Sequence, residues 1–169
     1  IEKLRKNYPA LEIINGYGPT EGTTFSITHN ILEITGEIPI GKPISNTQVY
    51  ILSEEEGLQP KGVIGEIYIG GEGLSRGYLN QKDLTKEKFI TSPFKAGERL
   101  YKTGDLGRWT KEGTIEFMGR RDAQVKIRGY RIELGEIEHA LKKHKEIDET
   151  VVLAKENQHK EKDLVAYIT

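Results

Sequence analysis

Residues 15–21 bring four kinds of chemical group together within one short segment. The segment reads Asn-Gly-Tyr-Gly-Pro-Thr-Glu, so it offers a planar amide, an aromatic ring, a hydroxyl and a carboxylate. These groups could contact the edge of a base, stack on its ring, contact a phosphate and hold a hard cation. Mg²⁺ is usually held by one or two carboxylates together with substrate phosphates, so Glu21 alone would be enough. An ordinary turn with exposed polar side chains is the alternative.

A second candidate is the segment of residues 101–106, Tyr-Lys-Thr-Gly-Asp-Leu, at the end of a predicted strand over residues 100–103. The Asp105 carboxylate could accept two hydrogen bonds from a vicinal diol such as ribose, as the acidic residue does in dinucleotide sites. Thr-Gly-Asp is also a common turn sequence, so a simple turn is the other interpretation.

A third candidate is the basic segment of residues 119–131, which has five basic side chains and one acidic side chain. It could contact phosphates, because guanidinium groups suit bidentate phosphate recognition, or it could be a strand with a solvated basic face. The whole chain has 25 Lys and Arg against 26 Asp and Glu, a formal charge of −1. We therefore expect no nucleic-acid partner, since non-specific binding to nucleic acid needs a positive excess.

The elements that must position these groups are mostly short strands. A stretch at residues 11–14 predicts a strand, and the glycines and proline after it predict a rigid loop over residues 15–21. Alternating apolar residues at 63–69, between glycines, predict a half-buried strand. Further strands are predicted at residues 47–52, 114–118, 123–127, 150–154 and 164–168. Helical spacing of apolar residues predicts a helix over residues 134–144, and a shorter one is expected over residues 82–89.

These patterns predict an α+β fold in two parts. Many short strands with Gly-rich turns predict a distorted β-barrel or sheet in residues 1–121. The strand, helix and strand of residues 122–169 predict a small α/β unit. The only Met is Met118 and the last strand reaches Thr169 without a terminator, so we expect a piece of a longer chain.

Composition excludes several other classes of protein. The chain has no Cys, which removes disulfides, thiolate metal sites and Cys nucleophiles, and its 4 His are too scattered for a zinc cluster. No apolar run approaches the roughly 18 residues that cross a bilayer, and no signal peptide opens the chain. We expect a cytoplasmic protein with no membrane partner.

Four segments, taken together and in order, resemble the motifs of the adenylation domains of nonribosomal peptide synthetases, in the adenylate-forming (AMP-binding) superfamily. They are residues 15–21, 65–79, 101–106 and 119–138. The resemblance covers essentially the whole chain. It implies that residues 1–121 are the end of the large subdomain, and that residues 122–169 are a hinge and the truncated start of the small C-terminal subdomain.

The family forms an aminoacyl-adenylate from an amino acid and Mg·ATP, and passes the acyl group to the phosphopantetheine of a peptidyl carrier protein. The resemblance therefore implies ATP and Mg²⁺ as cofactors. As partners it implies an amino acid, a carrier protein domain and a neighbouring condensation domain of a multidomain synthetase.

The resemblance also implies roles for residues in the first candidate segment. Asn15 would contact the adenine edge and Tyr17 would stack on the adenine. Thr20 would meet the phosphate and Glu21 would hold Mg²⁺, which makes these two the catalytic residues.

Further roles are implied elsewhere in the chain. Asp105 would bind the ribose hydroxyls, with Arg120 close to the same nucleotide. Phe117 lies where family members often have Tyr near the nucleotide. Asp122 matches the hinge about which the small subdomain rotates, and Gly129 lies in a loop that faces the active site in the thioester-forming state.

Gly16, Thr24 and Phe25 match part of the family's amino-acid pocket, in a combination that resembles valine-activating domains. Gly leaves room, while Thr and Phe would close a small pocket around a branched aliphatic side chain. One methylene in such a pocket is worth only about 1–3 kcal/mol, so we expect the preference for Val over Ile or Leu to be small.

Other family motifs are missing from the 169 residues. The phosphate loop and the acidic residue that grips the substrate ammonium would lie upstream, and the adenylation lysine downstream of Thr169. We therefore expect the chain alone to be inactive. Two alternatives are an acyl-CoA ligase of the same superfamily and a non-catalytic module that docks a carrier domain.

Overall fold

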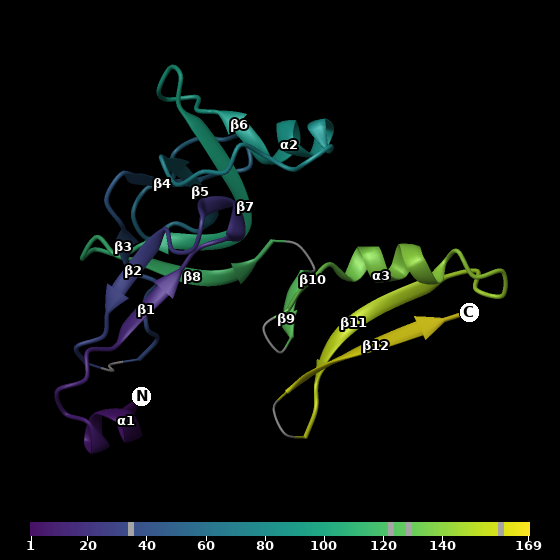
Figure 1. Cartoon of the computed structure of the whole chain (residues 1–169), viewed down its shortest axis with the longest axis horizontal. Helices are drawn as coiled ribbons and strands as arrows, with labels where there is room; N and C mark the ends of the chain where they lie inside the picture. The colour runs from purple at the N-terminus through teal and green to yellow at the C-terminus, as the bar shows by residue number, and fades with distance from the viewer. Residues whose placement is uncertain (34–35, 122–123, 128–129, 159–160) are drawn as a thin grey trace. The chain divides into compact units, whose positions relative to one another are not determined.

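The computed structural model of the chain describes residues 1–33, 36–121, 124–127, 130–158 and 161–169 (Figure 1). It divides into two compact units, Ile1–Arg121 and Asp122–Thr169. The first unit is rich in strands, and the described residues of the second form one helix and two β-hairpins. The predicted α+β class, with a distorted Gly-rich sheet followed by a small α/β part, is confirmed.

The centre of the first unit is a five-stranded antiparallel sheet with the order β4-β5-β7-β6, in which β8 pairs with the far end of β7. Its strands are β4 (Thr47–Leu52), β5 (Gly65–Gly71), β6 (Phe89–Thr91), β7 (Arg99–Trp109) and β8 (Ile115–Arg120). Helix α2 (Lys82–Lys88) precedes β6, close to the predicted helix over residues 82–89.

Strand β7 is the element that sequence reasoning described least well. The predicted strand ended at Thr103, with a turn at Thr-Gly-Asp as one interpretation, whereas β7 continues through Gly104 and Asp105 as far as Trp109. Gly104 adopts φ 73°, which glycine reaches without steric cost, and the register against β8 shifts between Leu106 and Gly107. Irregularities of this kind bend a strand while its pairing continues. Figure 1 shows the resulting curve of β7 as it leaves β5 and β6 and runs beside β8.

Both faces of β5 are covered, which also differs from the half-buried strand predicted at residues 63–69. Residues 65–70 are all buried. One face joins a large cluster made of Ile27, Ile40, Val49, Ile51, Ile67, Ile69 and Ile115. The opposite face joins a smaller cluster of Leu52, Tyr68 and Leu100. The alternation in the sequence predicted one exposed face. In the structure, residues distant in sequence pack on both faces, so neither face of β5 is exposed to water.

A smaller sheet carries the first candidate segment. It has the order β1-β2-β3 and consists of β1 (Ile14–Tyr17), β2 (Ile27–Asn30) and β3 (Lys42–Pro43). A short helix α1 (Glu2–Asn7) precedes it, and the 3-10 turn η1 (Thr20–Gly22) follows β1. The predicted strand over residues 11–14 and loop over residues 15–21 were therefore misplaced, because Asn15, Gly16 and Tyr17 pair with β2 as a strand.

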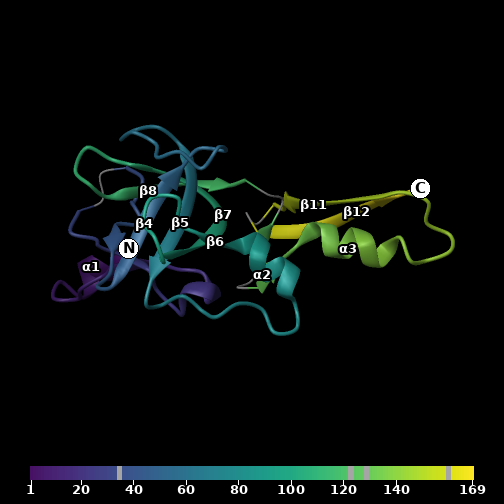
Figure 2. The same ribbon diagram turned by 90° about the horizontal axis from the view of Figure 1, so that it is seen from above.

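The second unit contains the predicted amphipathic helix as α3 (Leu134–Leu141), three residues shorter than expected. A small hairpin, β9 (Val125–Ile127) with β10 (Tyr130–Ile132), comes before it. A longer hairpin, β11 (Thr150–Glu156) with β12 (Lys162–Ile168), comes after it. Figure 2 shows α3 lying along this longer hairpin. The backbone N–H of Val152 donates to Oε1 of Glu138 at 2.8 Å, which ties α3 to β11.

None of the helices in the described part of the chain is long and apolar enough to cross a bilayer.

Candidate functional site

Three of the predicted residues lie in contact: Tyr17 and Arg120 both bond to the buried carboxylate of Asp105. Asp105 is only 8% exposed. The Tyr17 hydroxyl donates to its Oδ2 at 2.5 Å, and Arg120 Nη1 donates to its Oδ1 at 2.6 Å. Both bonds are charge-assisted, which makes them stronger than hydrogen bonds between neutral groups. The structure thus unites residues from β1, β7 and β8.

Strand register explains why Asp105 and Arg120 meet. The two residues lie directly opposite each other in the β7–β8 ladder, and directly opposed side chains of opposite charge stabilise a sheet. Tyr17 reaches the pair from the other sheet, 88 residues away in sequence.

Asp105 is also held through its backbone. Thr103 Oγ1 accepts a hydrogen bond from the Asp105 N–H at 3.0 Å and donates to the Ile67 carbonyl at 2.7 Å. Glu66, buried on β5, accepts the Gly104 N–H on Oε1 at 3.0 Å. Its other oxygen lies 3.5 Å from Arg121 Nη1. Neither Thr103 nor Glu66 was identified from the sequence, because their role depends on strand pairing.

Replacement of Glu66 with Ala should therefore destabilise the first unit by about 1 kcal/mol, near the lower end of the cost of leaving a donor unpaired, because Gly104 is only half-buried. The Gly104 N–H would lose its acceptor, and the bend of β7 at Gly104 would lose a stabilising hydrogen bond. Chemical denaturation measures this change. Glu54 also pairs with Arg121, at 2.9 Å, but it is 76% exposed, so Glu54→Ala is the matched control with little expected effect. Equal losses for the two variants would contradict the role of Glu66.

The Tyr17 hydroxyl is in the protonated form that donates a hydrogen bond to Asp105. Burial, followed by the neighbouring Asp105 carboxylate, raises the pKa of the Tyr17 hydroxyl well above its usual value. The hydroxyl therefore stays protonated at physiological pH and keeps donating to Asp105.

A second aromatic ring lies next to Tyr17. The ring centres of Tyr17 and Phe117 are 6.3 Å apart, with the planes inclined at 42°. Phe117 lies on β8 and is 41% exposed. Because Phe has no hydroxyl, it offers only an apolar face and edge to whatever binds there.

Glu21 makes a separate contact. It lies in η1, is 7% exposed, and accepts a hydrogen bond from the Tyr78 hydroxyl at 2.6 Å on Oε1. Thr20 is exposed at the start of the same turn. No group of three or more metal-binding side chains occurs among the described residues. A cation on Glu21 would thus take its other ligands from phosphate and water, which fits the habits of Mg²⁺.

The three residues predicted for the amino-acid pocket are partly brought together. A Cβ on Gly16 would lie 2.8 Å from two ring atoms of Phe25, so the Phe25 ring packs against Gly16 and needs a glycine there. Phe25 is 53% exposed and Thr24 is also exposed. Asn15, next to Gly16, donates from Nδ2 to the Pro39 carbonyl at 2.9 Å. Asp122 and Gly129 lie outside the described residues.

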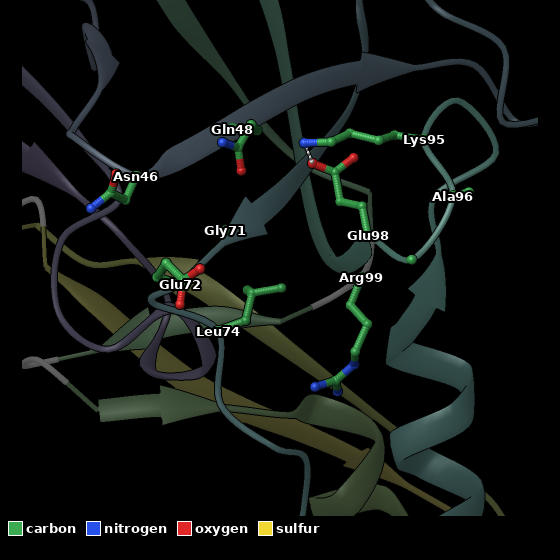
Figure 3. A pocket seen from close by; sticks show the side chains of 10 residues that line it. Asn46, Gln48, Gly71, Glu72, Leu74, Lys95, Ala96, Glu98 and Arg99 are labelled. Carbon is green, nitrogen blue, oxygen red and sulfur yellow. Dashed lines mark ion pairs between the residues drawn. The ribbon is translucent and has the colours of Figure 1, made fainter.

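A pocket of about 540 Å³ lies elsewhere on the first unit, between the start of β4, the end of β5 and the turn before β7. Figure 3 shows its polar lining, in which Lys95 and Glu98 form an ion pair at 3.7 Å. The Tyr50 hydroxyl donates to the other Glu98 oxygen at 3.0 Å. None of the residues predicted from the sequence lines it.

Comparison with known proteins identifies a matching family and several similar proteins. Residues 1–79 match the family described as AMP-binding enzyme. Gramicidin S synthase 2 of Brevibacillus brevis is 54% identical over 168 residues, which are 99% of this chain and 4% of that protein. Tyrocidine synthase 3 of Brevibacillus parabrevis is 52% identical over 157 residues, which are 93% of this chain and 2% of that protein. The chain therefore spans a small part of the curated relatives that it matches.

Solved structures extend the likeness to the fold. The chain resembles PA1221, an NRPS protein containing adenylation and PCP domains, with a TM-score of 0.86 and 34% identity. That match covers 99% of this chain and 34% of PA1221. It also resembles AB3403, a four-domain nonribosomal peptide synthetase solved with AMP and glycine, with a TM-score of 0.61 and 45% identity. This second match covers 93% of this chain and 12% of AB3403.

The first unit thus combines a bent antiparallel sheet with a buried carboxylate that accepts two hydrogen bonds, and a small α/β unit follows it in the chain. Residues 1–79 match the AMP-binding enzymes, and the chain as a whole is similar to nonribosomal peptide synthetases whose solved structures contain adenylation domains.

Proposed function

We propose that the chain is part of an adenylation domain that joins an amino acid to the AMP part of Mg·ATP and then transfers the aminoacyl group to a carrier protein. The observation that carries the proposal is the convergence of Tyr17 and Arg120 on Asp105. The likeness to AB3403, which was solved with AMP and glycine, supports a nucleotide and an amino acid as ligands.

Asp105 is suited to the ribose. A carboxylate has about four acceptor positions, so the bonds from Tyr17 and Arg120 leave capacity for two hydroxyl donors. The two protein donors fix the plane of the carboxylate before the ligand arrives. A preorganised acceptor of this kind loses little freedom on binding.

In this proposal, other residues of the site bind the adenine base and the phosphates. Asn15 contacts the edge of the adenine, while the rings of Tyr17 and Phe117 offer apolar surfaces 6.3 Å apart for stacking. Thr20 contacts a phosphate and Glu21 holds Mg²⁺, which neutralises charge as pyrophosphate leaves.

In this proposal, the two units correspond to the two subdomains of an adenylation domain. Unit Ile1–Arg121 is the end of the large subdomain, and unit Asp122–Thr169 is the hinge and the beginning of the small subdomain. Rotation about Asp122 would exchange the adenylating and thioester-forming states. The partners are the phosphopantetheine-bearing carrier domain and a condensation domain of a synthetase in the cytoplasm. The carrier partner is supported by the adenylation and PCP domains of PA1221.

We propose valine as the amino acid. The Phe25 ring packs on Gly16, which supports the proposal. With Thr24, it is expected to leave room for a small branched side chain. In ATP–pyrophosphate exchange with the intact domain, Val should exceed Phe and Glu by at least about 10-fold, while Ile and Leu fall closer. The 169-residue chain alone should show no exchange. Equal rates for Val, Phe and Glu would refute the choice of valine, and exchange by the chain alone would refute its inactivity.

Two alternatives have different outcomes in a thioester assay. An adenylation domain should load the carrier protein, whereas an acyl-CoA ligase should load free CoA. A non-catalytic docking module should bind the carrier protein while the intact protein binds no ATP. The charge-assisted bonds made by Asp105 favour the nucleotide-binding interpretation over the docking module.

A further inference from the structure

Tyr78 lies in the Gly-rich segment after β5 and contacts Glu21, which is 57 residues earlier in the chain. Its hydroxyl donates to Glu21 Oε1 at 2.6 Å. The sequence indicated no role for this tyrosine.

The backbones of the two segments are tied together beside this bond. The Ser75 N–H donates to the Glu21 carbonyl at 2.8 Å. The Thr23 hydroxyl donates to the Gly73 carbonyl at 2.7 Å. Two hydrogen bonds beside the contact therefore fasten the turn that carries Glu21 to the segment that carries Tyr78.

Tyr78 is itself held in place by contacts with Thr85 and Phe89. Its N–H donates to Thr85 Oγ1 at 2.9 Å, and that hydroxyl donates to the Gln81 carbonyl at 2.8 Å. The Tyr78 ring meets the Phe89 ring edge-on, with centres 5.8 Å apart. Gly77 has φ 137°, and a Cβ there would lie 2.4 Å from Thr85 Cγ2. Only glycine lets the chain approach Thr85 so closely, which sets the direction of Tyr78.

We propose that Tyr78 is a positioning residue that orients the Glu21 carboxylate for Mg²⁺. This inference rests on the proposed role of Glu21 as the metal ligand. A glutamate side chain has several rotatable bonds, and ordering it on metal binding costs conformational entropy. A hydrogen bond to one oxygen fixes the carboxylate in advance, and outer partners of metal ligands commonly affect metal affinity about 10- to 100-fold.

The test is Tyr78→Phe in the intact adenylation domain, which removes the hydroxyl and keeps the ring on Phe89. Mn²⁺ binding is measured by electron paramagnetic resonance with a non-hydrolysable ATP analogue. The variant should bind Mn²⁺ about 10-fold more weakly, while its affinity for the metal-free analogue changes less than about 2-fold. In the exchange assay the Mg²⁺ concentration for half-maximal rate should rise similarly, with the rate recovering at saturating Mg²⁺.

The matched control is Tyr50→Phe. The Tyr50 hydroxyl also donates to a glutamate, Glu98, at 3.0 Å, but at the pocket of Figure 3. This variant loses the same kind of bond and should bind Mn²⁺ normally. Equal weakening in both variants, or none in Tyr78→Phe, would overturn the proposal.

Two further variants complete the design. Thr85→Val removes the acceptor of the Tyr78 N–H and should weaken Mn²⁺ binding less than Tyr78→Phe, so an unchanged affinity would count against the support from Thr85. Glu21→Gln separates this inference from the proposed function. Unchanged Mn²⁺ binding in Glu21→Gln refutes Glu21 as the metal ligand. Weakened binding there with normal binding in Tyr78→Phe refutes only the role of Tyr78.

Discussion

Replacement of Asp105 with Asn in the intact adenylation domain is expected to weaken ATP binding about 100-fold. Hydrogen bonds to a charged group contribute about 1.5–3 kcal/mol, and about 1.4 kcal/mol corresponds to a factor of ten in affinity. The amide of Asn keeps the size of the side chain but loses the charge that Tyr17 and Arg120 share. It also replaces one acceptor oxygen with a donor, which suits a ribose diol poorly. Equilibrium binding of ATP measures the effect.

The control for this variant lies in the same strand pair. Arg108 and Glu116 also oppose each other across β7 and β8, at 2.7 Å, yet the Glu116 side chain is more exposed, at 27%. Glu116→Gln removes a comparable charge and should leave ATP affinity within about 2-fold. Thermal unfolding of both variants identifies any general loss of stability, because removing one partner of a buried pair is destabilising by itself. Normal ATP affinity in a folded Asp105→Asn variant would exclude Asp105 as the ribose residue.

Glu21→Gln should slow adenylation on the order of 100-fold at a fixed, subsaturating Mg²⁺ concentration. The expected size is that of losing one preorganised electrostatic group at a reacting centre. Gln keeps an oxygen that can accept from the Tyr78 hydroxyl, so the local fold should survive while the negative charge is lost. Single-turnover formation of aminoacyl-AMP, measured at several Mg²⁺ concentrations, tests this expectation.

Glu72→Gln is the comparison for this second variant. Glu72 is an exposed glutamate at the pocket of Figure 3 and should have little influence on the rate. A rate in Glu21→Gln that equals the rate in Glu72→Gln at every Mg²⁺ concentration would exclude Glu21 as a metal ligand. If Asp105→Asn behaved normally as well, the nucleotide assignment as a whole would fail.

Local patterns predicted the regular elements well where neighbouring residues alone decide them. The strand predicted at residues 47–52 corresponds to β4, and the helical spacing of apolar residues predicted α3. The strands predicted at residues 150–154 and 164–168 are both present in the β11–β12 hairpin. Prediction was poorer at residues 15–17, where pairing with β2 makes a strand from Gly-containing sequence. It was also poorer at Gly104, where pairing carries β7 through an apparent turn.

In the candidate site, too, local sequence predicted some features and long-range contacts decided the others. Asn15, Tyr17, Glu21, Asp105 and Arg120 were all selected from the sequence, because their chemistry and their match to family motifs are properties of short segments. Their roles toward a nucleotide stay predictions. Glu66, Thr103 and Tyr78 were missed as supporting residues. Glu66 and Tyr78 act on residues distant in sequence, and Thr103, although only two residues from Asp105, is itself held by the distant Ile67 carbonyl.

The sequence by itself determined the family, the fold class and the side chains available for chemistry. The tertiary structure alone decided which of them meet. Tyr17 reaches Asp105 across 88 residues, Tyr78 reaches Glu21 across 57, and Glu66 reaches Gly104 across 38. The physical reason is that a hydrogen bond acts over about 3 Å, so such partners depend on strand register and sheet curvature. Both are set by packing of the whole unit, and no local pattern of residues specifies them.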